Sequence, residues 1–405
     1  MGNANYPNPA NYSDLIDTLV AAEFLSGTFW DNTTRHRILL NRLVGNGSNA
    51  VHDMQGKYID LKVRVGEFSG AYRSEGQVRT FTRPNQFTQY QNQAAFYEVP
   101  AMLTEEDISF LNTQEAIVKY NKQILGNMSD DLAKGLNYQL LNSNATSNTV
   151  AGIAAAASTT NVIYGLPTVF GYGSTAIGYS QSAGTTSSAV SAADKEVLPN
   201  VTYCGVSTLP TATITGVTGK INESTSPVIT NWSSTAWSAA STTYQTNSPS
   251  VWRHMIRRLG MRNTDMEYFP DTGIHTPIMH DQMRAGLGSL TQQHVVLTEN
   301  AQNPNLGLFA ELMIPFEGLK IYPDVDCPAG VGYCLNTKKS AALLCVLPQY
   351  VAGVENGKFS GARQQRLVTV GQQPDIDAGV YKLVAKSALN AIFNPYRQAM
   401  TYNFA

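Results

Sequence analysis

Two histidines, His275 and His280, have side chains that could bind a metal, and they are five positions apart. A zinc-protease helix spaces its histidines four positions apart with a glutamate between them, which places both imidazoles on one face. The longer spacing and the missing glutamate argue against a zinc site. The sequence also contains no G-x-S-x-G or G-x-x-x-x-G-K-[ST] run, so it lacks the nucleophile elbow and the phosphate-binding loop of two large enzyme classes.

The chain contains four cysteines, which are too few to form a disulfide framework in 405 residues: Cys204, Cys327, Cys334 and Cys345. Cys327 and Cys334 are close enough in sequence to form a bridge, but their spacing matches no zinc pattern. We expect all four to be buried free thiols in a reducing compartment.

Two further motifs have ordinary structural explanations. The run Gly171-Tyr172-Gly173 precedes no predicted helix, so it is not a nucleotide-binding fingerprint. Arg253, Arg257 and Arg258 form a basic patch on a predicted helix, and a solvated or salt-bridged face explains them more simply than a binding site. The sequence therefore predicts no catalytic residue, no cofactor site and no metal site, although a catalytic triad need not be contiguous.

The longest element that the sequence predicts is a helix over residues 112–142. Its apolar side chains recur every three or four positions and form one stripe. The predicted core face consists of Ile117, Ile124, Leu132, Leu136 and Leu140. An amphipathic core helix is the simplest interpretation, and the segments before and after it indicate whether it is part of a larger known arrangement.

A long two-stranded hairpin is predicted over residues 51–100. Its first strand, KYIDLKVRV, alternates apolar and polar residues, and a Gln/Tyr/Phe-rich strand returns over residues 87–99. Charges of both signs lie at the end of the first strand and in the connecting segment: Arg64, Glu67, Arg73, Glu75, Arg79 and Arg83. An isolated ribbon is marginally stable in water, so this one needs a partner surface.

Composition limits the remaining possibilities. Only 14% of residues are charged and the net charge is -2, so the chain lacks the basic character of a tight nucleic-acid binder. Residues 142–250 are dominated by Ser, Thr, Ala and Gly, which indicates a β-rich or loop-rich insertion, with a disordered linker as the alternative.

We expect no secretory signal, because residues 1–15 are neither basic nor apolar. No apolar run is long enough to span a membrane.

The C-terminal part alternates short elements. We predict a helix over residues 250–260 with Pro249 near its start, a buried strand over 276–279 and a short helix over 280–290. Strands are predicted over residues 319–322, 340–349, 367–370 and 380–393.

This order of elements resembles the major capsid proteins of tailed bacteriophages with the Hong Kong 97-type fold. The resemblance depends on KYIDLKVRV with its return QNQAAFYEVPAML, on the helix NTQEAIVKYNKQILGNMSDDLAKGLNYQLL, on FEGLKIYP, and on the closing runs SAALLCVLPQYVAG and DAGVYKLVAKSALNAIFNPYRQAM. It implies an α+β fold with an N-terminal arm (1–50), an extended hairpin loop (51–100), and a peripheral domain with a spine helix (101–146). An axial domain with the Ser/Thr-rich insertion (147–340, insertion about 147–248), peripheral return strands (341–384) and a C-terminal axial strand and tail (385–405) complete it.

The resemblance also implies a function. The chain would assemble into hexamers and pentamers of an icosahedral virion shell around double-stranded DNA, in the host bacterial cytoplasm. Its partners would be portal, scaffolding and decoration proteins, with weak nonspecific DNA contact and no membrane. The charged residues from Arg64 to Arg83 would contact neighbouring subunits. No lysine lies between Val63 and Val118, so the loop crosslink of some family members is not expected. The family's N-terminal scaffolding region is also missing, which predicts a separate scaffolding protein.

Two other functions stay open at this point. The Ser/Thr/Asn-rich middle is compatible with a β-rich surface or adhesin-like protein, which would need an export route. A hydrolase is the remaining alternative.

Overall fold

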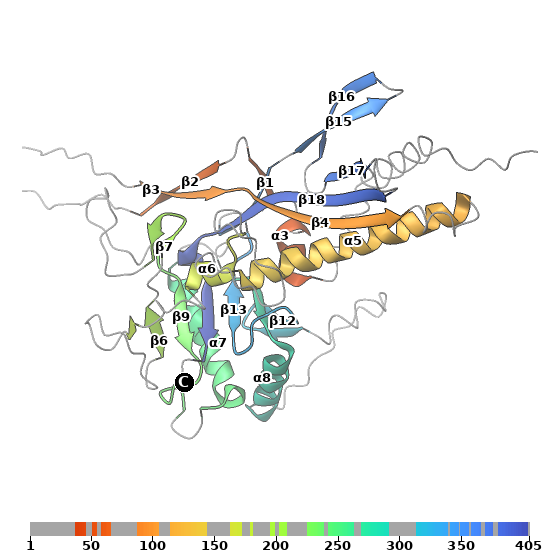
Figure 1. Ribbon diagram of the computed structural model, residues 1–405. Coiled ribbons are helices and arrows are strands. Elements are labelled where there is room, and N and C mark those ends of the chain that lie inside the picture. Colours follow the sequence, from red (N-terminus) through yellow and green to blue (C-terminus); the bar gives the residue numbers. More distant parts are fainter. Residues whose placement is uncertain are drawn as a thin grey trace, which may run out of the picture.

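The computed structural model describes residues 37–45, 51–54, 58–65, 87–104, 114–143, 163–171, 179–180, 195–198, 202–208, 225–238, 242–262, 269–290, 313–338, 341–347, 349–355, 358–365, 369–375 and 380–403. Two β-sheets organise these ranges, one of five strands and one of eight. Figure 1 shows a long helix lying along the first sheet and two helices beneath the second.

The long helix is α5 (Gln114–Asn142), which confirms the helix predicted over residues 112–142. It packs with the short helices α3 (Ile38–Gly45) and α6 (Leu166–Phe170). Glycine weakens a helix interior by about 1 kcal/mol, but Gly135 allows a close approach in α5. A Cβ atom at this position would lie 1.9 Å from the hydroxyl of Tyr97, so the glycine leaves room for the end of this tyrosine, which comes from β4.

The first sheet has the long strand β18 (Val380–Phe393) at its centre. β4 (Ala95–Thr104) pairs with it, and so do β14 (Ala342–Val346) and β17 (Thr369–Asp375), all antiparallel, while β1 (Val51–Asp53) adds to β14 in parallel. The strands predicted over residues 340–349 and 380–393 are thus confirmed, and the strand predicted over 367–370 overlaps β17 at Thr369 and Val370. Along β14, Leu344 and Val346 face the helices, whereas Leu343 and Cys345 face the opposite side, so the strand is buried on both faces.

The second sheet has the strand order β11-β12-β10-β13-β19-β9-β6-β5. Its strands are β11 (Ile314–Phe316), β12 (Leu319–Pro323), β10 (Thr272–His275), β13 (Gly332–Leu335), β19 (Ala399–Tyr402), β9 (Val228–Asn231), β6 (Glu196–Leu198) and β5 (Tyr179–Ser180). The strand predicted over 319–322 is confirmed. A 3₁₀ turn, η4 (Pro395–Arg397), connects β18 to β19 and so joins the two sheets. Tyr333 faces the core shared with α5, while Cys334 faces the other side.

Two helices cover the far side of the second sheet, and both differ from the prediction. α7 (Tyr244–Met261) begins before Pro249, which therefore lies inside the helix and not near its start. α8 (Pro277–Leu290) contains the helix predicted over 280–290, but it also includes Pro277, Ile278 and Met279 of the predicted buried strand, whereas the strand is β10, immediately upstream. Proline suits the first position of a helix because that residue needs no N–H donor, and Pro277 occupies this position.

Three pairs of strands form sheets of their own: β2 (Tyr58–Arg64) with β3 (Phe87–Gln93), β7 (Thr202–Tyr203) with β8 (Val206–Ser207), and β15 (Gln349–Glu355) with β16 (Lys358–Gln365). The return strand predicted over 87–99 is two strands, because β3 pairs with β2 while β4 pairs with β18. The ribbon β15–β16, which projects from the first sheet in Figure 1, was not predicted. Residues 1–36 of the predicted N-terminal arm lie outside the described residues.

Candidate self-association surface

The ribbon formed by β2 and β3 has two different faces. Residues directly opposite each other in an antiparallel pair lie on the same side. The inner ribbon face therefore consists of Ile59, Leu61, Val63, Thr88, Tyr90 and Asn92, and the outer ribbon face of Tyr58, Asp60, Lys62, Arg64, Phe87, Gln89, Gln91 and Gln93. All of the inner residues are buried or half-buried, and all of the outer ones except the half-buried Gln93 are exposed.

The inner ribbon face attaches the ribbon to the folded body. Tyr90 is fully buried, its ring centroid lies 5.9 Å from that of Tyr203, and burial raises the pKa of its hydroxyl. The backbone N–H of Gln91 donates to the carbonyl of Cys204 at 3.1 Å. Cys204 and Gly205 both have positive φ values, 48° and 85°, so β7 and β8 are joined by the two-residue turn that suits a tight hairpin.

A pair of asparagines lies where the chain leaves the ribbon. The amide of Asn390 on β18 donates to Asn92 Oδ1 at 3.0 Å and to the carbonyl of Gln93 at 2.6 Å. Asn92 returns a hydrogen bond to the carbonyl of Ala391 at 3.1 Å. Both asparagines are buried, and satisfied buried polar pairs specify a single arrangement. The direction in which the ribbon leaves the first sheet is therefore fixed.

The outer ribbon face is a mixed apolar and charged surface. Tyr58 is 54% exposed and Phe87 is 55% exposed, at opposite ends of the described ribbon. Three charged side chains, Asp60, Lys62 and Arg64, lie between or beside them. On β4, Phe96 is another exposed large apolar side chain. Exposed aromatic side chains next to charges of both signs are typical of a protein interface.

The structure describes only part of the predicted contact set. Arg64 is exposed at the end of β2. Glu67, Arg73, Glu75, Arg79 and Arg83 lie outside the described residues. In α5, Leu132, Leu136 and Leu140 are buried and Ile124 packs against the same cluster, whereas the side chain of Ile117 is not described.

His275 and His280 contact each other beside the buried rings of Tyr244 and Trp252. His275 Nε2 lies 2.9 Å from His280 Nδ1, and His275 Nδ1 lies 3.2 Å from the hydroxyl of Tyr244. Burial, reinforced by His280, lowers the pKa of His275 well below its usual range, and burial lowers that of His280 to about 4. Both ring nitrogens of His275 and Nδ1 of His280 are therefore engaged in hydrogen bonds within the protein.

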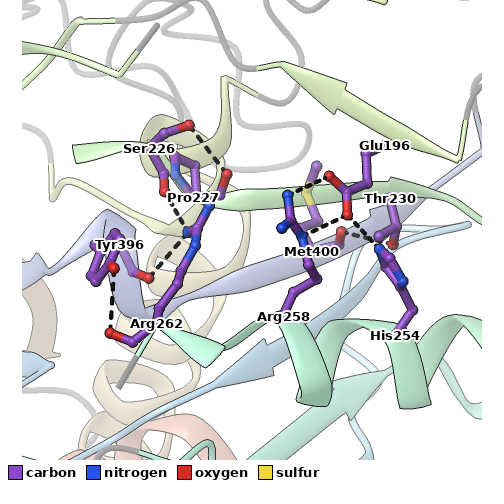
Figure 2. A network of polar contacts seen from close by, with 9 residues as sticks. All are labelled: Glu196, Ser226, Pro227, Thr230, His254, Arg258, Arg262, Tyr396 and Met400. Atoms are coloured by element: carbon purple, nitrogen blue, oxygen red, sulfur yellow. Dashed lines mark hydrogen bonds and ion pairs between the residues drawn. The ribbon is translucent and has the colours of Figure 1, made fainter. Parts of the chain in front are cut away.

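The arginines of α7 are ion-paired at two of three positions. Arg253 Nε lies 2.5 Å from Glu317, and Arg258 Nε lies 2.9 Å from Glu196, while Arg257 is exposed. These contacts agree with the predicted salt-bridged face. Glu196 also contacts His254, so its carboxylate holds two side chains of α7 (Figure 2). Burial alone would raise the pKa of Glu196, but hydrogen bonds from His254 and Arg258 outweigh it and lower the value to about 2.

A second polar contact fixes the end of α7. Arg262 donates to the carbonyls of Ser226 at 2.7 Å and Tyr396 at 3.2 Å, and its guanidinium lies 4.9 Å from the ring centroid of Tyr396 (Figure 2). The helix is thus fastened to β6 through Arg258, and its C-terminal end is fastened through Arg262 to Ser226, just before β9, and to η4.

The roles of Glu196, Asn92 and Asn390 were not predicted from the sequence. Glu196 had one available signal, because it is among the few charges of the Ser/Thr-rich insertion. The asparagines had none, since they are 298 positions apart. All four cysteines are buried and free, as predicted.

Within the described ranges, no three His, Cys, Asp or Glu side chains converge as metal ligands would. None of the described helices combines the length and the apolar character needed to cross a bilayer.

No protein-family model and no curated protein matches the sequence. Among solved structures, the chain is similar to one in the cyanophage A-1(L) capsid asymmetric unit, with a TM-score of 0.53 and 14% identity, over 88% of this chain and 90% of that one. The capsid of a native GTA particle matches with a TM-score of 0.47 and 8% identity, over 88% of both chains. The capsid of Myoviridae phage XM1 matches with a TM-score of 0.45 and 8% identity, over 89% of this chain and 92% of that one. Because the last two scores are below 0.5, the assignment depends on the first. The chain therefore has the fold of the cyanophage A-1(L) capsid chain, a mixed α+β arrangement.

Proposed function

We propose that this chain is the major capsid protein of a tailed bacteriophage, a subunit that assembles into an icosahedral shell enclosing double-stranded DNA. The observation that carries the proposal is a capsid fold that extends over 88% of the chain. Its role is structural and not enzymatic.

The ribbon β2–β3 is the element that we assign to contact between subunits. It corresponds to the extended loop of the Hong Kong 97-type fold, which lies across a neighbouring subunit. A ribbon of two strands has too little core to be stable alone, and here only its inner face is covered by the rest of the chain. The outer ribbon face, together with Arg73, Arg79 and the other charges of the connecting segment, would contact the neighbouring copy.

The remaining elements take the parts that this fold assigns. α5 is the spine helix of the peripheral domain, and β14, β17 and β18 are strands of the same domain. The second sheet, to which the Ser/Thr-rich insertion contributes β5, β6 and β9, forms with α7 and α8 the axial domain at the centre of each hexamer or pentamer. The assembled protein belongs to the virion and forms in the host cytoplasm, with portal, scaffolding and decoration proteins as partners. A net charge of -2 allows only weak contact with DNA.

Electron microscopy of the purified full-length protein tests the proposal directly. We expect closed shells, tubes, or rings of five and six subunits. A protein that stays monomeric at high concentration, alone and with scaffolding protein, would contradict it.

A double variant tests the role of the ribbon. Tyr58→Ser with Phe87→Ser removes two side chains whose exposed halves amount to ~100 Å² each, so at ~25 cal/mol per Å² each would contribute ~2.5 kcal/mol to an interface. The subunit should keep its circular dichroism spectrum and melting temperature but lose assembly. Ile278→Ser is the matched control, because this side chain is 72% exposed on α8, away from the ribbon. Equal assembly of both variants would remove the ribbon from the interface.

A further inference from the structure

Four buried side chains form one hydrogen-bonded chain that connects α7, β10 and α8. The indole Nε1 of Trp252 lies 2.7 Å from the hydroxyl oxygen of Tyr244, and the same hydroxyl lies 3.2 Å from His275 Nδ1. His275 Nε2 lies 2.9 Å from His280 Nδ1. His280 is the most exposed of the four residues, at 4%. Each contact therefore needs one hydrogen atom between its two polar atoms, because a buried polar group without a partner is costly.

The direction of this chain follows from the hydrogen atoms that each group carries. An indole N–H can only donate, so the oxygen of Tyr244 accepts from Trp252 and the hydroxyl hydrogen is left for His275 Nδ1. A neutral imidazole that accepts at Nδ1 carries its hydrogen on Nε2, so His275 donates to His280 Nδ1. The hydrogen of His280 is then on Nε2, a buried atom without a hydrogen-bond partner among the described residues. In this direction one donor is unpaired.

The opposite direction leaves two groups unpaired. If His275 carried its hydrogen on Nδ1, the oxygen of Tyr244 would accept from both Trp252 and His275, and its own hydrogen would have no acceptor in the contacts that the described residues make here. His280 would donate from Nδ1, and its Nε2 would become an unpaired acceptor. Because every unpaired buried group loses hydration without compensation, the first direction is favoured, with both histidines neutral and both hydrogens on Nε2.

One added proton breaks a hydrogen bond of this chain wherever it binds. A hydrogen on His280 Nδ1 would face the hydrogen on His275 Nε2, and two donors cannot bond each other. A hydrogen on His275 Nδ1 would face the hydroxyl hydrogen of Tyr244, which would have to turn away and lose its acceptor. His280 is also the fourth residue of α8, and a positive charge in the first turn of a helix is unfavourable. The packed arrangement therefore requires neutral histidines.

The charged groups of α8 near the pair act in opposite directions. Burial lowers the pKa of His280, Asp281 raises it and Arg284 lowers it again. Both of these charged side chains are exposed, so water screens them. They do not compensate a positive charge inside the chain.

The groups that reach the pair from the other elements do not compensate such a charge either. From α7 and β10 these are Tyr244 and His275 themselves. In the segment after β12, Cys327 acts on Tyr244, but burial raises the pKa of its thiol well above the usual range, so it stays neutral. Asp324 donates its backbone N–H to the carbonyl of His275 at 2.9 Å, while its carboxylate accepts from Asn137. A proton on the pair is thus best accommodated when water reaches His280.

Two different contacts hold α8 at its two ends. Toward the C-terminal end, Gly286 lies so close to α7 that a Cβ atom there would be 2.0 Å from the carbonyl oxygen of Gln245, and this backbone packing does not titrate. At the N-terminal end, the bond between His275 and His280 connects the first turn to β10. We propose that this bond is an acid-sensitive latch. While both rings are neutral, it holds the first turn of α8 and the buried Met279 against the second sheet, and one proton releases that turn.

Hydrogen–deuterium exchange of the full-length subunit, corrected for the intrinsic effect of pH on exchange rates, tests the latch. The pKa of His280 is lowered from 6.5 to about 4 in the folded chain, and each unit corresponds to a tenfold change in the opening equilibrium. Exchange of the amides of residues 279–284 should therefore increase at least ~10-fold between about pH 7 and about pH 5. Amides of α5 should not respond.

Two histidine variants provide the comparison. His280→Gln should abolish the increase, because a carboxamide accepts the hydrogen bond from His275 but does not titrate. His254→Gln removes a histidine of α7 that lies outside the hydrogen-bonded chain and should leave the increase unchanged. Absence of the increase in wild type, or an equal increase in His280→Gln, overturns the proposal.

Two exposed substitutions separate a latch from a pair that only fills space. Asp281→Asn removes the charge that raises the pKa of His280, so it should move the midpoint of opening to lower pH. Arg284→Gln removes the charge that lowers this pKa, so it should move the midpoint to higher pH. Shifts in the same direction, or no shift in either variant, overturn the proposal.

Nitrogen-15 NMR of the histidine rings tests the direction of the chain. At neutral pH both His275 and His280 should carry their hydrogen on Nε2, and an Nδ1 hydrogen on His275 contradicts the assigned direction and overturns the latch. All of these measurements use the unassembled subunit, so they do not depend on the proposed function.

Discussion

Replacing Glu196 by Gln should weaken the attachment of β6 to α7. The substitution keeps the shape of the side chain and removes the charge that holds His254 and Arg258. The difference between the ordinary pKa of 4.5 and the value of about 2 in the folded chain corresponds to an upper limit of ~3 kcal/mol. Arg258 is 40% exposed, and solvent screening reduces the expected loss to about 1–2 kcal/mol.

The pH dependence follows from the direction of this pKa difference. A carboxyl group with a lowered pKa stabilises the folded state fully above its unfolded value, and the contribution disappears as the pH falls toward the folded value. Wild type should therefore lose its advantage over Glu196→Gln between about pH 4.5 and pH 2.

Urea denaturation of the unassembled subunit, followed by circular dichroism, measures both effects. Glu317→Gln is the matched control, because Glu317 pairs with Arg253 on the same helix but both side chains are exposed. Its loss should be below ~0.5 kcal/mol. The reasoning is refuted if the two variants lose equal stability near neutral pH, or if the difference between wild type and Glu196→Gln is unchanged in acid.

Three other outcomes are expected. Leu132→Asp should abolish soluble subunit by placing an unpaired charge in the core. Lys134→Ala, which changes an exposed residue on the opposite side of α5, should express normally. Equal yields of the two variants would mean that this stripe is not buried. Because the pKa of His280 is lowered to about 4 in the folded chain, the unfolded chain binds the proton first as the pH is lowered. The free energy of unfolding should therefore decrease as the pH falls from about 6.5 to about 4. His280→Gln should reduce this dependence on pH in urea titrations. Arg73→Ala with Arg79→Ala should leave a folded subunit that forms weak shells or none, and denaturing gels of wild-type particles should contain only the monomer near 44.0 kDa; a ladder of covalent multimers would contradict noncovalent pairing.

The sequence was most informative where one periodicity extends over many residues. α5 continues for 29 residues, so the three- and four-residue spacing of its apolar side chains outweighs local exceptions such as Gly135. The 14 residues of β18 were also predicted as a strand, and the resemblance of this segment to the closing strands of the capsid family supported that interpretation.

Partner changes were not predictable. The segment from Phe87 to Thr104 reads as one extended run, and nothing in its alternation marks the point near Ala94 where it leaves β2 for β18. Proline also misled the assignment of α8, because Pro277 after a buried strand reads equally well as strand or as the first residue of a helix. In both places, tertiary pairing decides the outcome.

The point near Ala94, where the chain leaves the ribbon for the first sheet, connects these observations to assembly. Seven residues of β2 extend about 23 Å at ~3.3 Å per residue, so a bend of ~5° at this point would displace the far end of the described ribbon by ~2 Å. Such a displacement exceeds the tolerance of a hydrogen bond or an ion pair. The hydrogen bonds from Asn390 to Asn92 and from Asn92 to the carbonyl of Ala391 oppose this bend. Because the ribbon has no core of its own, its direction depends on these two buried amides, and contacts made by the outer ribbon face depend on them in turn.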